Sequence, residues 1–297
     1  MFILLVAMVA ALAIRLLVVG GLHTSALLYV GIPFLLALFF IATLVKDPGE
    51  ALGAQFIRHI QVSIIVCLTV SMLLGEGFIC VAFLLPIYLF FVSLAYGIVA
   101  LFEYAERRGT RTMVSLLPFA VVLSAFEGTT PALRAPDLYT VTAAAVTAQP
   151  LDEVMANAAR PFELRKPRHW LLAIFPMPYA IDQPSMQVGS VHTVYTRYHR
   201  WFVANTHEGS VQLEIVRNDP DRLVMQYRDD SSYFANYLQV ISSEIRARPI
   251  DGTQTEVTLS ITFRRKLDPA WYFGPLQRFA VTRMAEFLLD EVTIRND

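Results

Sequence analysis

Charge is distributed so unevenly along this chain that it divides the sequence into two parts of different chemistry. Of the 24 Lys and Arg and 25 Asp and Glu residues, only 11 lie in residues 1–126, and the other 38 lie in the remaining 171 residues. Long apolar runs with so few charges are typical of helices that cross a bilayer, whereas the second part has the composition of a water-soluble domain. The sequence therefore predicts a transmembrane domain at 1–126, a linker at 127–137 that is rich in glycine and proline, and a soluble domain at 138–297.

Five apolar segments of the first part are candidates for transmembrane helices, because about 20 apolar residues are needed to cross the hydrocarbon core. The first two are Phe2–Val19 and Ala26–Val45; the first lacks a cationic leader and is expected to be retained as a span. The third and fourth run from about Ile57 to Phe102, with a hairpin turn expected at Gly75-Glu76-Gly77. The fifth, Thr112–Phe126, is short and contains a proline. The expected fold class of this part is an all-α, multi-span membrane domain.

Cationic residues in the short loops predict the orientation of these helices, because such loops are enriched in Lys and Arg on the cytoplasmic side. The loops after the second and fourth spans carry five cationic residues, and the other two loops carry none; the five are Lys46, Arg58, Arg107, Arg108 and Arg111. We therefore expect a bacterial inner-membrane protein with a cytoplasmic N-terminus. With five spans the C-terminal domain lies in the periplasm, whereas it is cytoplasmic if the fifth segment dips into the membrane and returns.

Four residues around the expected hairpin are candidates for a functional role in the membrane. Glu76 and Gly77 lie in the turn, where the carboxylate is either solvated or placed at the mouth of a groove. Cys80 is expected to be a small packing residue, and Pro86 is expected to kink the fourth span. No chain of intramembrane Asp, Glu or His is recognised, so an ion relay is not expected.

The second part has the alternating pattern of β-strands, followed by one long amphipathic segment. A strand at Tyr139–Ala148 precedes a helix that opens at Pro150, and Arg160–Gln187 is expected to be irregular. Further strands are predicted at Ser190–His199, Ser210–Arg217 and Arg222–Arg228, then a hairpin of Val240–Pro249 with Thr255–Leu267, and a last helix from Asp268-Pro269 to about Val292. The expected fold class is α+β, with a curved antiparallel sheet around a long C-terminal helix.

This order of elements resembles the START-like helix-grip superfamily, which is also called SRPBCC and includes polyketide cyclases and lipid-transfer domains. The resemblance is carried by Ala148-Gln149-Pro150-Leu151-Asp152-Glu153-Val154 after the first strand, by Gly189, by Glu214-Ile215-Val216 leading to Asp219-Pro220-Asp221-Arg222-Leu223, and by Trp271-Tyr272-Phe273. It covers about Leu138–Ile294. Through Glu76-Gly77-Phe78-Ile79-Cys80 and Pro86, the first part also resembles the anchors of bacterial membrane-tethered members of this group.

The resemblance implies a deep, mostly apolar cavity for a hydrophobic ligand between sheet and helix. Aromatic residues of the second part are the candidates for its lining, namely Trp170, Phe175, Tyr195, Trp201, Phe202, Tyr227, Phe234 and Phe279. The alternative is that most of them are ordinary core residues, because large apolar side chains dominate any protein interior.

The remaining residue patterns exclude several classes of function. His192 and His199 are seven residues apart on one strand and therefore lie on opposite faces, and His169 and His207 are isolated, so no metal or other cofactor is expected. No metalloprotease, serine-hydrolase or phosphate-loop motif is present. Both cysteines, Cys67 and Cys80, lie in the apolar part, so the soluble part has no disulfide. The net charge of −1 argues against nucleic acid as a partner.

The sequence therefore favours a membrane-anchored domain that binds a lipid or another hydrophobic small molecule, with membrane lipids as its other partners. Two alternatives stay open: an enzyme of cyclase or hydrolase type that uses the same cavity, and an assembly subunit that docks a protein partner. An acid–base pair in the cavity, such as a histidine or aspartate beside a tyrosine or serine, would favour the enzyme. No catalytic residue is assigned.

Overall fold

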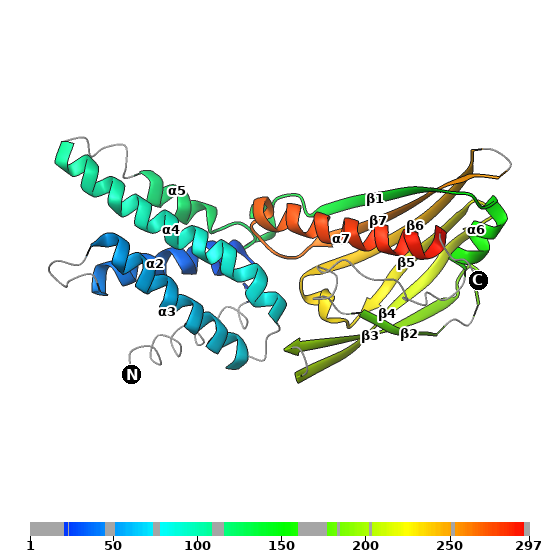
Figure 1. The fold of residues 1–297 in the computed structure, drawn as a ribbon, viewed down its shortest axis with the longest axis horizontal. Coiled ribbons are helices and arrows are strands. Elements are labelled where there is room, and N and C mark those ends of the chain that lie inside the picture. Colours follow the sequence, from blue (N-terminus) through cyan, green and yellow to red (C-terminus); the bar gives the residue numbers. More distant parts are fainter. Residues whose placement is uncertain are drawn as a thin grey trace. The chain divides into compact units, whose positions relative to one another are not determined.

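The computed structural model describes residues 21–22, 24–44, 51–73, 78–108, 116–159, 177–182, 185–201, 204–250 and 253–293. The chain divides into two compact units (Figure 1). The first, here called the helical unit, comprises residues 1–136 and Leu267–Tyr272. The second, here called the sheet unit, comprises Asp137–Lys266 and Phe273–Asp297.

The helical unit is built around one long helix, α4, against which α2 and α3 both pack. Its elements are a π-helical turn η1 (Leu27–Gly31), α2 (Ile32–Leu44), α3 (Leu52–Leu73), α4 (Phe78–Arg108), α5 (Leu116–Ser124) and a 3₁₀ turn η2 (Pro131–Leu133). The unit's core joins apolar faces of α2 and α4, including Phe34, Ile87 and Phe91. The helices α3 and α4 lie where the third and fourth spans are predicted, and the expected turn at Gly75-Glu76-Gly77 lies outside the described residues.

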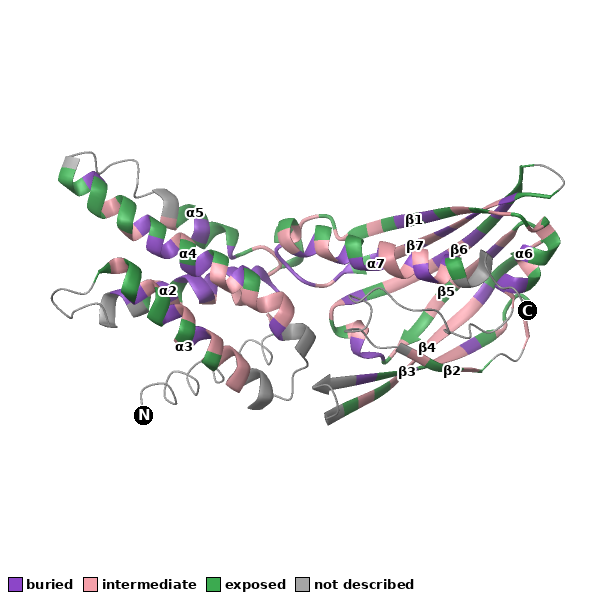
Figure 2. Cartoon of the chain, viewed as in Figure 1, coloured by how far each residue is buried: buried purple, intermediate pink, exposed green. Residues whose placement is uncertain are grey.

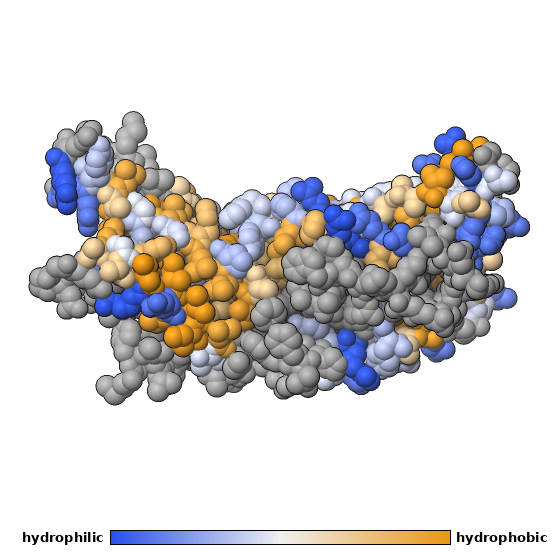
Figure 3. Space-filling model, in the orientation of Figure 1, coloured by the Kyte–Doolittle hydropathy of each residue, from blue (hydrophilic) through white to orange (hydrophobic). Residues whose placement is uncertain are grey.

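The surface of the helical unit is unusually apolar. Large apolar side chains that point outward occur on several of its helices, among them Phe39, Ile57, Phe90 and Phe119, each more than half exposed. In Figure 3 hydrophobic residues cover much of this unit's visible face. Exposed apolar patches of this size favour contact with lipid or with another protein.

Two of the described helices are long and apolar enough to cross a membrane, at Leu52–Thr69 in α3 and Val81–Arg107 in α4. These correspond to the third and fourth predicted spans. The second predicted span coincides with η1 and α2, of which Leu27–Phe39 counts as a shorter apolar helix, and the first predicted span lies outside the described residues. Of the fifth predicted span, Thr112–Phe126, the structure describes residues 116–126, which include the helix α5. Two spans are therefore supported by length and composition.

Six residues from the C-terminal half of the chain, Leu267–Tyr272, pack within the helical unit. The backbone N–H of Ala270 donates to Glu127 Oε1 at 2.8 Å, and the N–H of Asp268 donates to the Thr24 carbonyl at 2.8 Å. The Tyr272 hydroxyl donates to the Phe83 carbonyl of α4 at 2.9 Å. These bonds tie a late segment of the sequence to the helices formed by its first half.

The sheet unit is a single antiparallel sheet with the strand order β1-β7-β6-β5-β4-β3-β2 among the described residues. Its strands are β1 (Leu138–Thr147), β2 (Met177–Asp182), β3 (Val191–Trp201), β4 (Ala204–Asp219), β5 (Arg222–Asp230), β6 (Leu238–Pro249) and β7 (Thr255–Arg265). A short 3₁₀ turn, η4 (Tyr233–Asn236), joins β5 to β6. Sequential strands from β2 to β7 pair as neighbours, and β1 closes the order by pairing with β7.

The long helix α7 (Ala270–Thr293) runs along one face of the curved sheet, and the short helix α6 (Leu151–Ala158) lies at one end of it (Figure 1). The core between them contains Ile245, Val257, Ile261 and Phe263 from the sheet, together with residues of α7, of which Ala285 is completely buried. Burial alternates along β7 as expected for a strand with one face inside (Figure 2). The predicted helix-grip arrangement, a curved antiparallel sheet around a long C-terminal helix, is confirmed.

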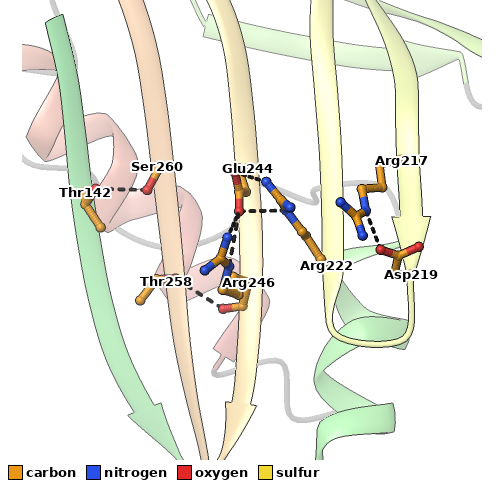
Figure 4. Close-up of polar contacts among 8 residues, drawn as sticks. All are labelled: Thr142, Arg217, Asp219, Arg222, Glu244, Arg246, Thr258 and Ser260. Carbon is orange, nitrogen blue, oxygen red and sulfur yellow. Dashed lines mark hydrogen bonds and ion pairs between the residues drawn. The ribbon is translucent and has the colours of Figure 1, made fainter.

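The face of the sheet that points away from α7 is polar. The hydroxyl groups of Thr142 and Ser260 pair across β1 and β7 at 2.9 Å. Glu244 accepts hydrogen bonds from Arg222 and Arg246, and Arg217 pairs with Asp219 (Figure 4). Such cross-strand pairs are typical of a solvated sheet face. The inner face of the sheet is therefore the one on which a ligand site has to be sought.

Candidate functional site

The inner face of the sheet unit combines an apolar floor with a few polar side chains. Strand register places Ser243 opposite Met225, Tyr227 opposite Leu213, and Leu213 opposite His192. Because residues that pair directly lie on the same face and Met225 and Tyr227 are two residues apart on β5, these side chains form two neighbouring rows of one face, Ser243 with Met225 and Tyr227 with Leu213 and His192; the two together are here called the row. The row carries two hydroxyls and one imidazole among aliphatic neighbours.

Tyr227 is the most strongly perturbed group of this row. Its removal from water raises the pKa of the phenol to about 12, while a hydrogen bond with the Ser243 side chain acts in the opposite direction and the nearby Asp230 charge adds to the increase. The phenol therefore stays neutral at physiological pH. A neutral hydroxyl pair can donate to or accept from the polar end of a ligand, but it provides no base.

His192 is buried at the β3 end of the row, and its Nε2 lies 2.7 Å from the Ser185 carbonyl oxygen. A carbonyl oxygen only accepts, so Nε2 carries a proton and donates it to Ser185. Thr196, further along the same face of β3, donates to the Gly209 carbonyl at 3.2 Å. Backbone carbonyls therefore satisfy both polar groups, which gives this end of the inner face fixed polar positions.

An aromatic cluster lies beyond this row, where β3 and β4 meet the turn η4. The rings of Tyr198 and Tyr233 stack with centroids 4.6 Å apart, and Tyr237 and His207 each approach Tyr233 edge-on. Tyr198 and Tyr233 are both buried. The sequence analysis did not identify this cluster, because its members come from three elements and only tertiary structure brings them together.

The predicted lining residues separate into three groups. Tyr227 lies on the inner face, and Phe234 of η4 packs against the core, so both lie on the side where the cavity is predicted. Tyr195 is 40% exposed on the opposite face of β3, where it contacts Tyr179, and Phe279 is 45% exposed on α7 beneath the Arg283 guanidinium. This corrects the expectation for Tyr195 and Phe279, which lie outside the interior. Trp170, Phe175 and Phe202, and the side chain of Trp201, lie outside the described residues.

The predicted hairpin residues are described only in part. Glu76 and Gly77 lie outside the described residues, as does the side chain of Cys80 within α4. Pro86 lies inside α4, and the helix continues through it to Arg108. Its missing N–H leaves the Ala82 carbonyl without the usual helical donor, one residue before the carbonyl that accepts from Tyr272.

Neither a metal centre nor an acid–base pair is evident in the described ranges. No group of three or more His, Cys, Asp or Glu side chains there could hold a metal ion. His192 and His207 each contact a backbone carbonyl, of Ser185 and Ser231 respectively.

Comparison with known proteins gives matches to solved structures alone. No family model matches the chain, and no curated protein matches it. Among solved structures, it is similar to the Zhui aromatase/cyclase from Streptomyces sp. R1128, with 16% identity over 52% of this chain and 92% of that one and a TM-score of 0.35. Ara h 8.0201 is 14% identical over 54% of this chain and 99% of that one, with a TM-score of 0.35. The norcoclaurine synthase from Thalictrum flavum, in complex with dopamine and hydroxybenzaldehyde, is 12% identical over 54% and 89%, with a TM-score of 0.34.

Proposed function

We propose that this chain is an integral protein of a bacterial inner membrane whose sheet unit binds a lipid or another hydrophobic small molecule. The observation that carries the proposal is the Tyr227–Ser243 hydroxyl pair beside the apolar core of the inner face. A core that only stabilises a fold gains little from buried hydroxyls, because each must be desolvated and rebonded. An amphipathic ligand uses both features, since its chain contacts the apolar floor and its polar end bonds to a hydroxyl.

The fusion to an apolar helical unit supports the same proposal. A ligand that partitions into a bilayer is captured most readily by a site that is tethered to that bilayer, because tethering raises its effective concentration. The helices α3 and α4 have the length and composition of such a tether. Lipid binding is put ahead of catalysis because Tyr227 bonds to the Ser243 hydroxyl and His192 bonds to a backbone carbonyl, so neither forms a hydrogen-bonded acid–base pair.

Native mass spectrometry of the full-length protein, purified in mild detergent, tests this proposal directly. We expect a retained small molecule of lipid mass in the wild-type protein and in Tyr195→Trp, because Tyr195 lies on the outer face. Tyr227→Trp should lose that molecule and should lose uptake of a lipid with a fluorescent acyl chain, because the larger ring fills the space at the hydroxyl pair.

The thermal transition of Tyr227→Trp distinguishes a ligand site from a filled core. A larger side chain forced into a filled core destabilises by about 1–3 kcal/mol, whereas at an open site the fold survives. A melting temperature that falls sharply, with no retained molecule in any variant, would contradict ligand binding.

We also propose that the N-terminus is cytoplasmic and the sheet unit periplasmic, on the basis of the five loop cations. A C-terminal alkaline phosphatase fusion should then be active, and a green fluorescent protein fusion dark. The reverse pattern would mean that the segment ending in α5 returns to the side from which it entered.

A further inference from the structure

A stripe of polar side chains lies between α3 and α4 in the otherwise apolar helical unit. Gln55, His59 and Ser63 follow at intervals of four residues and therefore share one face of α3. Tyr88 and Tyr96 face them from α4. All but Tyr88 are buried, His59 to 2% exposure. These five residues are here called the polar seam.

The seam forms one continuous chain of contacts. Ser63 Oγ lies 2.9 Å from the Tyr88 hydroxyl, and the Tyr88 hydroxyl lies 3.5 Å from His59 Nε2. On the other side of the imidazole, His59 Nδ1 lies 3.3 Å from the Tyr96 hydroxyl. That hydroxyl is 3.4 Å from the backbone carbonyl oxygen of Gln55. The His59 ring also packs edge-on against the ring of Tyr96.

The bond at the Gln55 end of the chain determines which group donates and which accepts in each of the other bonds. The Gln55 carbonyl can only accept, so the single Tyr96 proton is donated there. The Tyr96 oxygen then accepts from Nδ1–H of His59, which leaves Nε2 as the acceptor of the Tyr88 proton. The Tyr88 oxygen in turn accepts from Ser63. The resting imidazole is therefore neutral and carries its proton on Nδ1.

Serine and threonine residues elsewhere in these two helices show a second acceptor to which the Ser63 hydroxyl can donate. Thr69 Oγ1 donates to the Ile65 carbonyl and Ser93 Oγ donates to the Leu89 carbonyl, each four residues earlier and at 2.8 and 2.7 Å. Ser63 has the same option at the carbonyl of His59, four residues before it. The hydrogen bonds from Ser63 to Tyr88 and from Tyr88 to His59 can thus reverse their direction, and each hydroxyl still donates a bond.

We infer that the polar seam is a proton-responsive hydrogen-bond chain, in which His59 rests as the neutral Nδ1–H form and takes up a solvent proton at Nε2. A proton delivered to the Oγ of Ser63, a residue that is 6% exposed, lets Ser63 pass its own proton to Tyr88 and Tyr88 pass its proton to Nε2. The product is an imidazolium whose Nε2–H donates to Tyr88, while Tyr88 donates to Ser63 and Ser63 to the backbone. One proton is gained, and every hydroxyl keeps a donor bond.

The groups that face His59 are consistent with such a chain. From α4 they are Tyr88 and Tyr96. The neighbouring helix α2 has no titratable side chain over Ile32–Leu44. On α3 itself, Arg58 is exposed, and Cys67 interacts electrostatically with Tyr88. Polar groups inside a membrane are costly and are usually functional, so a buried chain of this length calls for a role beyond packing.

Nitrogen NMR of the full-length protein with ¹⁵N-labelled histidine rings, in lipid nanodiscs, tests this inference. His59 is assigned by the loss of its signals in His59→Gln. Near neutral pH we expect a protonated Nδ1 and a bare Nε2. On acidification both nitrogens should become protonated, and the Tyr88 signals should change over the same pH range, because its hydroxyl reverses.

Matched variants separate the chain from general effects on the fold. Tyr96→Phe should abolish the single-tautomer pattern, because Nδ1–H loses its acceptor, whereas Tyr104→Phe, on an exposed position of α4, should leave it unchanged. Ser63→Ala should remove the Tyr88 response, whereas Ser93→Ala should not. A resting Nε2–H form, or a His59 that never titrates while the other histidines do, would overturn the inference.

Discussion

Arg134 and Asp268 lie 134 residues apart in the sequence, yet Arg134 Nε donates to Asp268 Oδ2 at 3.1 Å within the helical unit. The two side chains are unequally exposed, since Arg134 is 31% exposed and Asp268 is completely buried. Loss of its cation costs a buried carboxylate more free energy than loss of its anion costs a partly exposed guanidinium. Only the guanidinium can be hydrated again. The pair therefore holds Leu267–Tyr272 in place mainly by satisfying Asp268.

Substitutions at these two positions should differ in their effect on stability. Arg134→Leu is expected to cost about 3–5 kcal/mol, the usual effect of removing one partner from a buried ion pair. Asp268→Asn keeps a hydrogen-bonding side chain and should cost about 1 kcal/mol. Thermal unfolding in detergent measures both, with Arg107→Leu at an exposed position of α4 as the control. Equal effects at Arg134 and Asp268 would argue against this asymmetry.

Gly128 should tolerate no side chain, because it meets Asp268 directly. Its φ of +76° lies in the left-handed region, and a Cβ at this position would lie 1.9 Å from Asp268 Oδ2. Gly21 provides a matched control, since its φ is +70° and a Cβ there meets nothing within 4 Å. Gly21→Ala should therefore cost only the backbone strain of about 1–2 kcal/mol, whereas Gly128→Ala adds the clash. Similar melting temperatures for the two variants would contradict the close approach.

The raised pKa of Tyr227 predicts a loss of stability in alkali. Because the folded state holds the neutral phenol up to about pH 12, against 10.0 for the unfolded chain, the folded form binds the proton more tightly. The contribution of Tyr227 to the free energy of unfolding is fully present below pH 10 and is lost as the pH rises to about 12. Unfolding of the sheet unit by denaturant across this range should show the loss, and Tyr227→Phe should remove part of it. An identical pH profile for Tyr227→Phe would show that another group is responsible.

The strands that the sequence predicted are those whose periodicity is encoded locally. The patterns at 190–199, 210–217 and 222–228 correspond to β3, β4 and β5, and the final hairpin corresponds to β6 and β7. The strand β2 was not predicted, because Pro178 and neighbouring prolines indicate irregular structure. Proline is tolerated there because β2 is an edge strand, and the register shifts between Pro178 and Ala180.

The residues of the candidate sites were harder to predict, because each depends on a partner from another element. On β3 both faces mix apolar and polar residues, so the pattern alone does not decide whether Tyr195 or His192 points inward; the burial of His192 decides it. His59 stands among other polar residues of α3, such as Gln55 and Ser63, and the sequence alone does not show what it contacts. Its role becomes visible only when α4 brings Tyr88 and Tyr96 against α3.

The sheet unit should fold without the preceding helices. Its core runs from Tyr139 to Leu289 and draws only on residues of that unit, so a fragment of residues 137–297 retains every one of its core contacts. We expect this fragment to be soluble and to unfold in one cooperative transition. The start of α7 should fray, because Asp268, Ala270 and Tyr272 lose the hydrogen bonds that the helical unit provides.

Hydrogen exchange measures this fraying residue by residue. Amide protection in the fragment should match that of the full-length protein in β7 and in the part of α7 that packs on the sheet, and it should fall at Ala270–Phe273. Glu127→Gln in the full-length protein, which weakens the acceptor of the Ala270 N–H, should reproduce a smaller part of this fall. A fragment that aggregates under several conditions, or that lacks protection throughout β7, would show that the sheet needs the helical unit in order to fold.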